Sequence, residues 1–258
     1  MLGNTNLIFY RKMMEKTKIY VYNDDTQEEI DYLENEPEVI DFHLNLRYIY
    51  VHSVHPNDKK NYINVFNMSD FQVVLYQVCL GQNGMRSQIS ICHNFPTVFY
   101  WSLKDSGKIA SMTMEQRPSE SPQLHSNSIP IYKISQSNKY ILTCSKRATT
   151  YRIYSMKNFE MLSQLKWSYK QRKISSMDIE KNDTYYLVCL DEGYVFVSFL
   201  DGKKLFDIQT DMKRPQGIFL NQRDLIMIFD SKLNVVVYQI DATNYEAIQV
   251  FKTKVSGI

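Results

Sequence analysis

The sequence predicts an all-β fold, a β-propeller built from blades of the WD type. First, short apolar or alternating runs bounded by polar turns recur from end to end, whereas helical periodicity is nearly absent. Second, strands that end in an aromatic residue recur at about the spacing of one propeller blade. Third, aromatic residues make up 13% of the chain and there are only 8 glycines. This composition favours strands joined by turns of Asn, Asp, Ser and Lys.

The predicted strands follow one another along the whole chain. Each is a short run rich in β-branched and aromatic side chains. Their ranges are 18–23, 39–44, 48–54, 62–67, 97–103, 129–135, 140–145, 149–155, 185–190, 194–200, 224–230 and 234–241. The best-defined unit adds "EMLSQLKW" at 160–167. Four antiparallel strands are therefore expected there, separated by short polar turns.

Six aromatic residues mark matching strand ends in this repeat: Tyr22, Phe66, Trp101, Tyr154, Phe199 and Tyr238. Successive members are 44, 35, 53, 45 and 39 residues apart, near the ~40–45 residues of a WD blade. A Pro/Ser-rich loop at 114–128 accounts for the longest spacing. Because one blade cannot bury both faces of its sheet, the blades are expected to stack around an axis as a single domain over residues 1–258.

The repeat leaves the number of blades open. Six units are visible, and the first begins at "TNLIFY" without an innermost strand. Either a first blade is missing, or the C-terminal "AIQVFKTKVSGI" helps to close a six-bladed ring.

The four cysteines, Cys79, Cys92, Cys144 and Cys189, lie far apart, form no C-x-x-C pair and are placed in apolar runs. This pattern predicts small buried side chains in a reducing compartment rather than zinc ligands or disulfides. No segment reaches the ~18 apolar residues needed to span a bilayer, and the first residues have too short an apolar run for a signal peptide. We expect a cytoplasmic protein without a transmembrane segment.

Charge is segregated along a chain whose net charge is only +2. Residues 24–41 carry nine acidic residues and no basic one. Residues 145–173 carry eight basic residues and one acidic residue, a net charge of +7. A charge run in a loop is often only a solvated surface. Positive potential concentrated over two neighbouring blades nevertheless favours an anionic partner, such as a lipid headgroup, an acidic protein or a nucleic acid.

The stretch "YILTCSKRATTYRIYSMKNFEMLSQLKWSYKQRKISSMDIEKNDTYYLVCL" resembles the PROPPIN family, seven-bladed propellers that bind phosphatidylinositol 3-phosphate and serve autophagy. The family pattern here is a strand pair, a short hairpin, the motif F-R-R-G and a further strand, and this sequence aligns with it without a gap. Upstream, "TNLIFY" to "KIYVYN" and "EVIDFHLNLRYIYVHSV" to "YINVFN" look like the family's second and third blades. The resemblance implies a seven-bladed propeller with about six blades in this chain.

The resemblance also implies a phosphoinositide-binding site. Ser145, Thr149 and Arg152 match the Ser, Thr and Arg of the family's first pocket, and Lys166 replaces the first arginine of F-R-R-G. A supporting basic patch surrounds them: Lys146, Arg147, Lys170 and Arg172. Because Arg152 lies in a strand, we expect it to contribute more to binding than the flexible Lys166.

The sequence departs from the family pattern at the second pocket. The F-R-R-G motif falls on 165–168, so Trp167 replaces the second arginine. Asp191 and Glu192 occupy the phosphate-facing turn, Val197 stands in place of a histidine, and a tight turn replaces the apolar loop that inserts into bilayers. Losing one of two linked pockets removes avidity worth ~10²- to 10⁴-fold. We expect Trp167 to pack between blades, and we expect weak headgroup binding through one pocket.

The acidic run implies a second surface. In the family the second and third blades recruit a lipid-transfer protein, so Glu34, Glu36 and Glu38 are expected to bind a basic segment of a protein partner. Enzymatic chemistry is not indicated, because the chain has no G-x-S-x-G motif, no metal-spaced His/Cys set and no Gly-rich phosphate loop. His125 is expected to hold the fold, and no cofactor, metal or nucleic-acid partner is expected.

Two functions follow from these observations. The first is a monomeric, autophagy-related propeller that binds phosphatidylinositol 3-phosphate and acts as a peripheral scaffold on autophagic or endosomal membranes. The alternative is a degenerate propeller that serves only as a platform for protein–protein interaction and does not bind lipid.

Overall fold

The computed structural model describes the backbone of residues 6–13, 16–23, 28–35, 38–44, 48–54, 60–67, 73–82, 89–92, 98–103, 106–113, 119–167, 171–220 and 224–254. Side chains are described for 49–53, 62–67 and, from residue 103 onward, within those ranges. The regular secondary structure of the described residues consists only of β-strands, so the all-β prediction is confirmed. The chain divides into two compact units, Met1–His93 and Asn94–Ile258. That residues 1–258 form a single domain stays a prediction.

The first unit begins with a three-stranded antiparallel sheet in the order β1-β2-β3 and continues with a four-stranded sheet in the order β4-β5-β6-β7. Within the described residues the first sheet thus has three strands, as expected from "TNLIFY", which begins this unit without an innermost strand. Consecutive residues of β5 (49–53) and β6 (63–66) are buried, so these strands are covered on both faces. The strands are β1 (Asn6–Met13), β2 (Lys16–Asn23), β3 (Glu28–Asn35), β4 (Glu38–Leu44), β5 (Tyr48–Val54), β6 (Lys60–Asn67), β7 (Val73–Gln82) and β8 (Ile89–Cys92).

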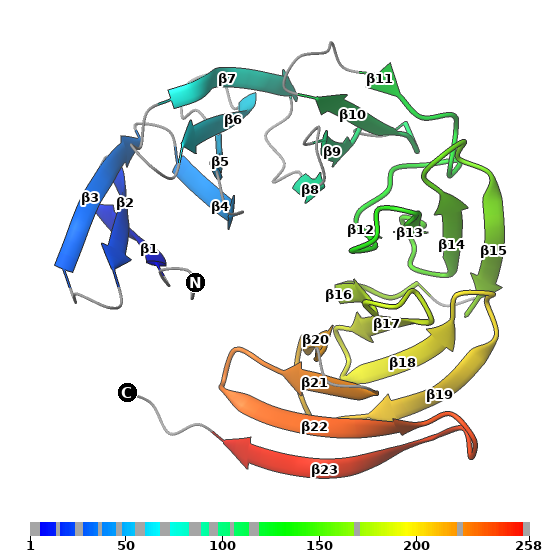
Figure 1. The fold of residues 1–258 in the computed structure, drawn as a ribbon. Helices are drawn as coiled ribbons and strands as arrows, with labels where there is room; N and C mark the ends of the chain where they lie inside the picture. The colour runs from blue at the N-terminus through cyan, green and yellow to red at the C-terminus, as the bar shows by residue number, and fades with distance from the viewer. Residues whose placement is uncertain are drawn as a thin grey trace. The chain divides into compact units, whose positions relative to one another are not determined.

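The second unit contains β9, β10 and β11, paired in that order, and then three four-stranded antiparallel sheets in which the strands pair in chain order. Figure 1 shows these sheets following one another in the second unit. The strands are β9 (Val98–Ser102), β10 (Ile109–Thr113), β11 (Ser119–Glu120), β12 (Tyr132–Ile134), β13 (Tyr140–Cys144), β14 (Thr150–Ser155), β15 (Met161–Lys166), β16 (Ile174–Ile179), β17 (Tyr185–Leu190), β18 (Tyr194–Phe199), β19 (Lys204–Gln209), β20 (Gln216–Phe219), β21 (Leu225–Phe229), β22 (Asn234–Asp241) and β23 (Glu246–Lys254).

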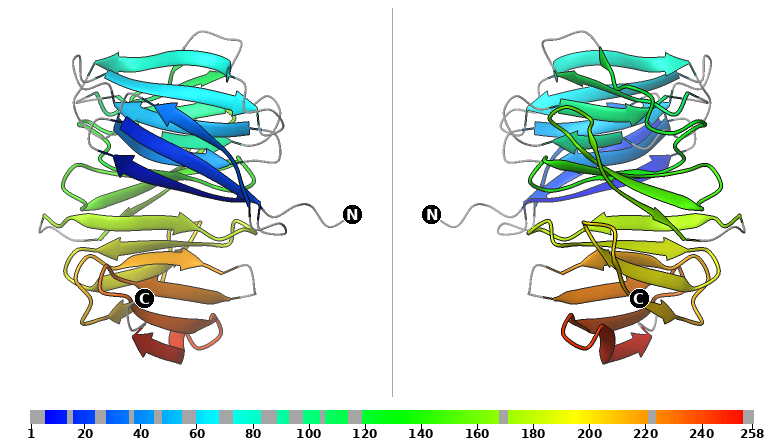
Figure 2. Two further views of the ribbon diagram at one scale, coloured as in Figure 1. Left: turned by 90° about the vertical axis from the view of Figure 1, so that its left-hand side faces the viewer. Right: turned by 90° about the vertical axis from the view of Figure 1, so that its right-hand side faces the viewer.

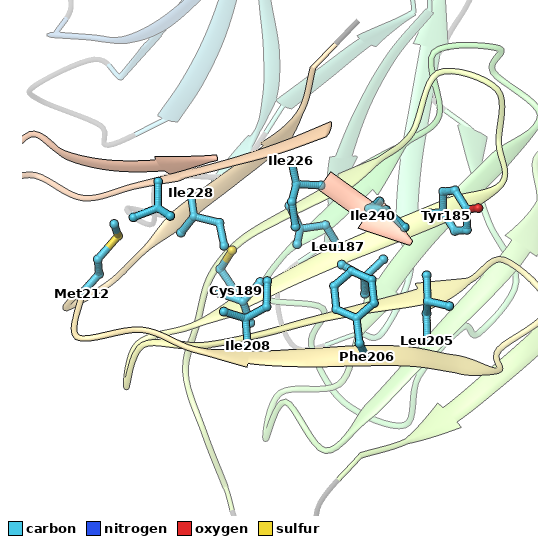
Figure 3. Packing of buried hydrophobic residues seen from close by; sticks show 13 residues of the cluster. Tyr185, Leu187, Cys189, Leu205, Phe206, Ile208, Met212, Ile226, Ile228 and Ile240 are labelled. Atoms are coloured by element: carbon cyan, nitrogen blue, oxygen red, sulfur yellow. The ribbon is translucent and has the colours of Figure 1, made fainter. Parts of the chain in front are cut away.

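The core of the second unit lies between successive sheets. Both views of Figure 2 show the last three sheets stacked in chain order, with β23 in red at the end of the stack. Figure 3 shows one interface, where Leu187 and Cys189 of β17 pack against Ile226 and Ile228 of β21. Every residue of β17 is buried, because this strand has neighbours on both edges and a sheet on each face. The outer strand β15 is exposed or half-buried throughout.

Innermost strands of neighbouring sheets are joined by polar contacts around Asp178 of β16. Its Oδ1 lies 3.0 Å from Lys133 Nζ of β12, and its Oδ2 accepts a hydrogen bond from the Phe219 N–H of β20 at 2.9 Å. One buried carboxylate therefore connects three sheets. Such a carboxylate requires partners because an unpaired buried charge is strongly destabilising.

A β-bulge repeats in the third strand of most sheets and explains the aromatic repeat. The pairing register shifts immediately before Tyr22, Phe66, Tyr154 and Tyr238, and one residue before Phe199. Tyr22, Phe66, Tyr154 and Tyr238 therefore occupy matching places, whereas the matching residue of β18 is Ser198 and Phe199 lies one residue further along the strand. The bulge bends the strand and raises its twist, and the pattern of aromatic strand ends follows from that geometry.

The sixth member of the repeat, Trp101, was assigned wrongly. It lies in β9, and β10 separates β9 from the last strand of that sheet, β11. In the four-stranded sheets from β12 onward, by contrast, the aromatic strand pairs directly with the last strand. The second and third strands of a blade are both apolar runs, so an aromatic strand end alone does not distinguish them.

Candidate anion-binding site

The site predicted from the sequence begins at the turn between β13 and β14. Ser145 Oγ accepts hydrogen bonds from the backbone N–H groups of Thr149, at 3.3 Å, and Thr150, at 3.1 Å. Ala148 has a φ of 53°, which lets the chain reverse direction. The Ser145 hydroxyl therefore stabilises the turn, and Lys146 and Arg147 are exposed at its tip.

Arg152 of β14 is held by protein acceptors. Its Nε donates to Gln164 Oε1 of β15 at 2.8 Å, and its Nη1 donates to the Leu124 carbonyl at 2.5 Å. Tyr154 Oη donates to the same carbonyl at 2.5 Å. Two of the five N–H donors of this guanidinium are therefore used by Gln164 and Leu124.

His125 lies beside this arginine and is buried. Its Nε2 is 2.9 Å from Thr143 Oγ1, and the Thr143 hydroxyl lies 3.2 Å from the Arg152 carbonyl, to which it donates. A hydroxyl has one proton, so Nε2–H is the donor to Thr143. Burial, and secondarily the charge of Arg152, lowers the pKa of His125 to about 4. A neutral, bonded histidine fits the predicted role of holding the fold.

Trp167 packs between two sheets, as predicted. Its ring stacks on Phe196 of β18 with centroids 4.1 Å apart and an angle of 11° between the planes. Tyr194 lies 5.6 Å away, and the Lys204 ammonium lies 4.6 Å from the Trp167 centroid. The indole therefore fills the interface and carries a cation on its surface.

Around this tryptophan is a pocket of about 440 Å³. We call it the cationic pocket, because it presents three cations beside two aromatic rings. Arg172 also lies over the Tyr194 ring, at 5.5 Å. The pocket is lined by Leu165, Lys166, Trp167, Arg172, Tyr194 and Lys204.

Two carboxylates partly neutralise the cationic pocket. Arg172 Nη1 is 3.2 Å from Glu192 Oε2, and Lys204 Nζ is 2.5 Å from Asp207 Oδ1. Tyr194 also donates a hydrogen bond to Asp207. Burial lowers the pKa of Lys204 and raises the pKa of Asp207, so both charges are incompletely solvated. Lys166 makes no ion pair with any residue that the structure describes.

The predicted headgroup residues do not all lie in this pocket. Lys166 and Arg172 line it, whereas Ser145, Thr149 and Arg152 are not among its lining residues. Lys170 lies outside the described residues. That all four predicted headgroup residues share one ligand stays a prediction.

Lys204 and Tyr194 were missed by the sequence analysis. Lys204 follows the tight turn "DGKK", more than thirty residues beyond the basic run, and only the stacking of β19 beside β15 brings it to Trp167. Its charge was visible in the sequence, but its position was not.

The acidic turn of the predicted second pocket has basic partners. Glu192 pairs with Arg172, and Asp191 Oδ2 lies 4.0 Å from Arg214 Nε. The Asp191 N–H donates to the Lys173 carbonyl at 2.9 Å. Both carboxylates of this turn therefore have a cationic partner within the same unit.

The predicted partner-binding acids lie in the first unit. Glu34 is in β3, directly across from Lys18 of β2 in the pairing register, and Glu38 begins β4. Glu36 lies outside the described residues. Lys18 is therefore a cation opposite part of the acidic run, which the sequence analysis did not anticipate.

Cys144 and Cys189 are free and buried, as predicted; the side chains of Cys79 and Cys92 lie outside the described residues. Within the described ranges no group of three or more His, Cys, Asp or Glu side chains is arranged to hold a metal ion. In the same part of the chain, no helix is long and apolar enough to cross a membrane.

The fold has close structural counterparts. No family model matches the sequence, and no curated protein matches it. Hsv2 of Kluyveromyces marxianus has a TM-score of 0.77 and 13% identity, covering 99% of this chain and 84% of its own. Hsv2 of Kluyveromyces lactis has a TM-score of 0.78 and 11% identity, covering 99% and 85%. KlAtg21, in a complex with the coiled coil of AgAtg16, has a TM-score of 0.76 and 13% identity, covering 97% and 82%. Since Hsv2 and Atg21 are PROPPIN propellers, the predicted resemblance is confirmed for the fold.

Proposed function

We propose that this propeller binds the anionic headgroup of phosphatidylinositol 3-phosphate through the cationic pocket and acts as a peripheral, non-catalytic scaffold in autophagy. The observation that carries the proposal is a concave site with three cations at the position where the sequence aligns with F-R-R-G. Its volume of about 440 Å³ is in the range of small-molecule pockets. The likeness in fold to Hsv2 and Atg21 supports the same function.

Lys166 is the cation expected to contribute most to this binding. It has no carboxylate partner in the described chain, whereas Arg172 and Lys204 do. A charge-assisted hydrogen bond to phosphate is worth ~1.5–3 kcal/mol, so Lys166→Ala should weaken binding by roughly ten- to a hundredfold. The sequence alone favoured Arg152, which is already bonded to Leu124 and Gln164. Arg152→Ala tests that earlier expectation directly.

The experiment is co-sedimentation with phosphatidylcholine vesicles that contain or lack phosphatidylinositol 3-phosphate, at two ionic strengths. Binding should require the phosphoinositide and weaken with salt, because solvent-exposed charges are screened. Circular dichroism of each variant controls for folding. Equal recovery with both vesicle types would refute headgroup recognition, and loss of binding in Arg152→Ala alone would move the site to the β13–β14 turn.

A protein partner is the second part of the proposal. The acidic segment 24–41 carries nine carboxylates, which favour a basic protein segment and disfavour an anionic membrane. The solved complex of KlAtg21 with the coiled coil of AgAtg16 supports a protein partner. Replacing Glu34, Glu36 and Glu38 with Lys should reduce recovery of the partner in a pull-down from the native cell. Glu160→Lys and Asp211→Lys are the control, and equal recovery from both proteins would contradict the assignment.

If no anionic lipid binds even at low ionic strength, the alternative is a platform for protein interaction alone. Glu192 and Asp207 favour this alternative, since they already pair with two of the three cations of the cationic pocket. The pull-down and the vesicle assay together distinguish the two functions.

A further inference from the structure

Two of the three cations that line the cationic pocket are paired with carboxylates that are not among its lining residues. Glu192 pairs with Arg172 at 3.2 Å and Asp207 pairs with Lys204 at 2.5 Å. Three cations and two carboxylates leave a net charge of +1. To bind Arg172 or Lys204 in addition to Lys166, an incoming anion must displace a carboxylate, so the charge of the ligand decides how many of the three cations it can bind.

Neither ion pair is strongly held. The side chain of Glu192 is 69% exposed, and those of Lys204 and Asp207 are 40% and 33% exposed. Ion pairs at this exposure are worth only ~0.2–1 kcal/mol. Arg172 and Lys204 can therefore each release their carboxylate in favour of an anion that binds them more tightly.

The cations remain in place when their carboxylates are released. Lys204 rests on the face of Trp167 at 4.6 Å, and Arg172 rests on Tyr194 at 5.5 Å. Trp167 is in turn fixed by stacking on Phe196. A ligand thus meets positioned cations rather than free side chains, which lowers the entropic cost of binding.

We infer that Glu192 and Asp207 determine the selectivity of the cationic pocket: they admit a phosphate monoester and exclude a phosphodiester. A monoester carries a charge of about −1.5 to −2 at pH 7 and three strong acceptor oxygens, which match the three cations. A phosphodiester has one charge and two such oxygens, so it does not outcompete two carboxylates. The ligand class deepens the function proposed above and rests on it.

Isosteric amides test this role without changing the shape of the site. Asp207→Asn and Glu192→Gln each remove one competing charge, and the amide oxygen introduced by Asp207→Asn still accepts a hydrogen bond from the Tyr194 hydroxyl. The matched control is Asp201→Asn, which removes a carboxylate that pairs with Lys203 at 3.7 Å, outside the pocket. The probes are glycerophosphoinositol 3-phosphate, which has a monoester, and glycerophosphoinositol, which has only the diester.

Titration calorimetry should show that the natural protein binds the monoester probe and not the diester. Each amide variant should bind the monoester about three- to tenfold more tightly, and the double variant should also bind the diester. Asp201→Asn should behave as the natural protein. Unchanged affinity in both amide variants would overturn the inference while leaving headgroup binding intact.

The outcomes separate this inference from the proposed function. If the natural protein binds neither probe but the double variant binds the monoester, the carboxylates do exclude anions and the natural protein is not a headgroup receptor. If neither protein binds either probe, both ideas are wrong. If the natural protein does bind the monoester probe, vesicles containing phosphatidylinositol 3-phosphate show whether the monoester is recognised on a lipid or only as a free headgroup.

Discussion

Acidification is expected to destabilise this protein through His125. In the folded chain burial lowers the pKa of His125 from 6.5 to about 4, and the charge of Arg152 acts in the same direction. The unfolded chain therefore binds more protons between pH 6.5 and pH 4. Stability from this group is fully present above pH 6.5 and is lost as pH falls through that window.

The size of the loss follows from the two pKa values. The full difference corresponds to about 3 kcal/mol, and about 2 kcal/mol of it is lost between pH 7 and pH 4.5. Protonation adds a charge beside Arg152 in a buried site. A loss of about 2 kcal/mol is a large fraction of the free energy of unfolding of an ordinary domain.

The measurement is urea unfolding at pH 7 and pH 4.5 for the natural protein and for His125→Gln. Glutamine can still donate to Thr143 Oγ1 but does not titrate, so its pH-dependent loss should be smaller by about 2 kcal/mol. Carboxylates with lowered pKa values, such as Asp230, contribute equally to both proteins and cancel. An equal loss in the two proteins would refute the assignment of a neutral buried histidine.

Arg152→Met provides a second arm of the same test. Removing the guanidinium should raise the pKa of His125 towards its usual value, because one of its two causes is gone. The variant should be less stable at pH 7, since the Leu124 carbonyl loses a donor, and its stability should depend less on pH. A steeper pH dependence would contradict the coupling.

Three further outcomes are expected. Trp167→Ala should lower the free energy of unfolding in urea by about 2 kcal/mol, since it removes a half-buried ring stacked on Phe196. Trp167→Phe should lower it less. An unchanged free energy of unfolding in Trp167→Ala would contradict the packing of this ring. Gly217→Ala should lower the stability by about 1–3 kcal/mol, because its Cβ would lie 2.8 Å from Cys189 Sγ. Thermal unfolding measures this loss, and an unchanged midpoint would contradict the close approach of the two strands. Cys144 and Cys189 should resist alkylation until the protein unfolds, since burial raises the pKa of both thiols, that of Cys189 to about 12; labelling of either in the native protein, mapped by mass spectrometry, would show that these sheets open.

Local pattern was sufficient to predict just over half of the strands and most of the repeat; strands such as β3, β7, β16 and β19 were not predicted. Alternating and apolar runs identify strands because side chains point to opposite faces with a period of two residues. Four of the six aromatic strand ends directly follow the same β-bulge, so their spacing reflects structural equivalence, and a fifth, Phe199, lies one residue beyond the equivalent position. The assignment of Trp101 failed because strands with two buried faces look alike in sequence, and their order within a sheet depends on pairing between strands.

The sequence by itself also determined the segregation of charge and the place of the motif resembling F-R-R-G. It could not determine which charges are already paired. Arg152 meets the Leu124 carbonyl across 28 residues, and Lys204 meets Trp167 across 37 positions of the chain. Only the stacking of sheets brings such side chains together, because contacts between blades depend on packing that no local period encodes. The tertiary structure thus decided the composition of the cationic pocket and paired two of its three cations with carboxylates.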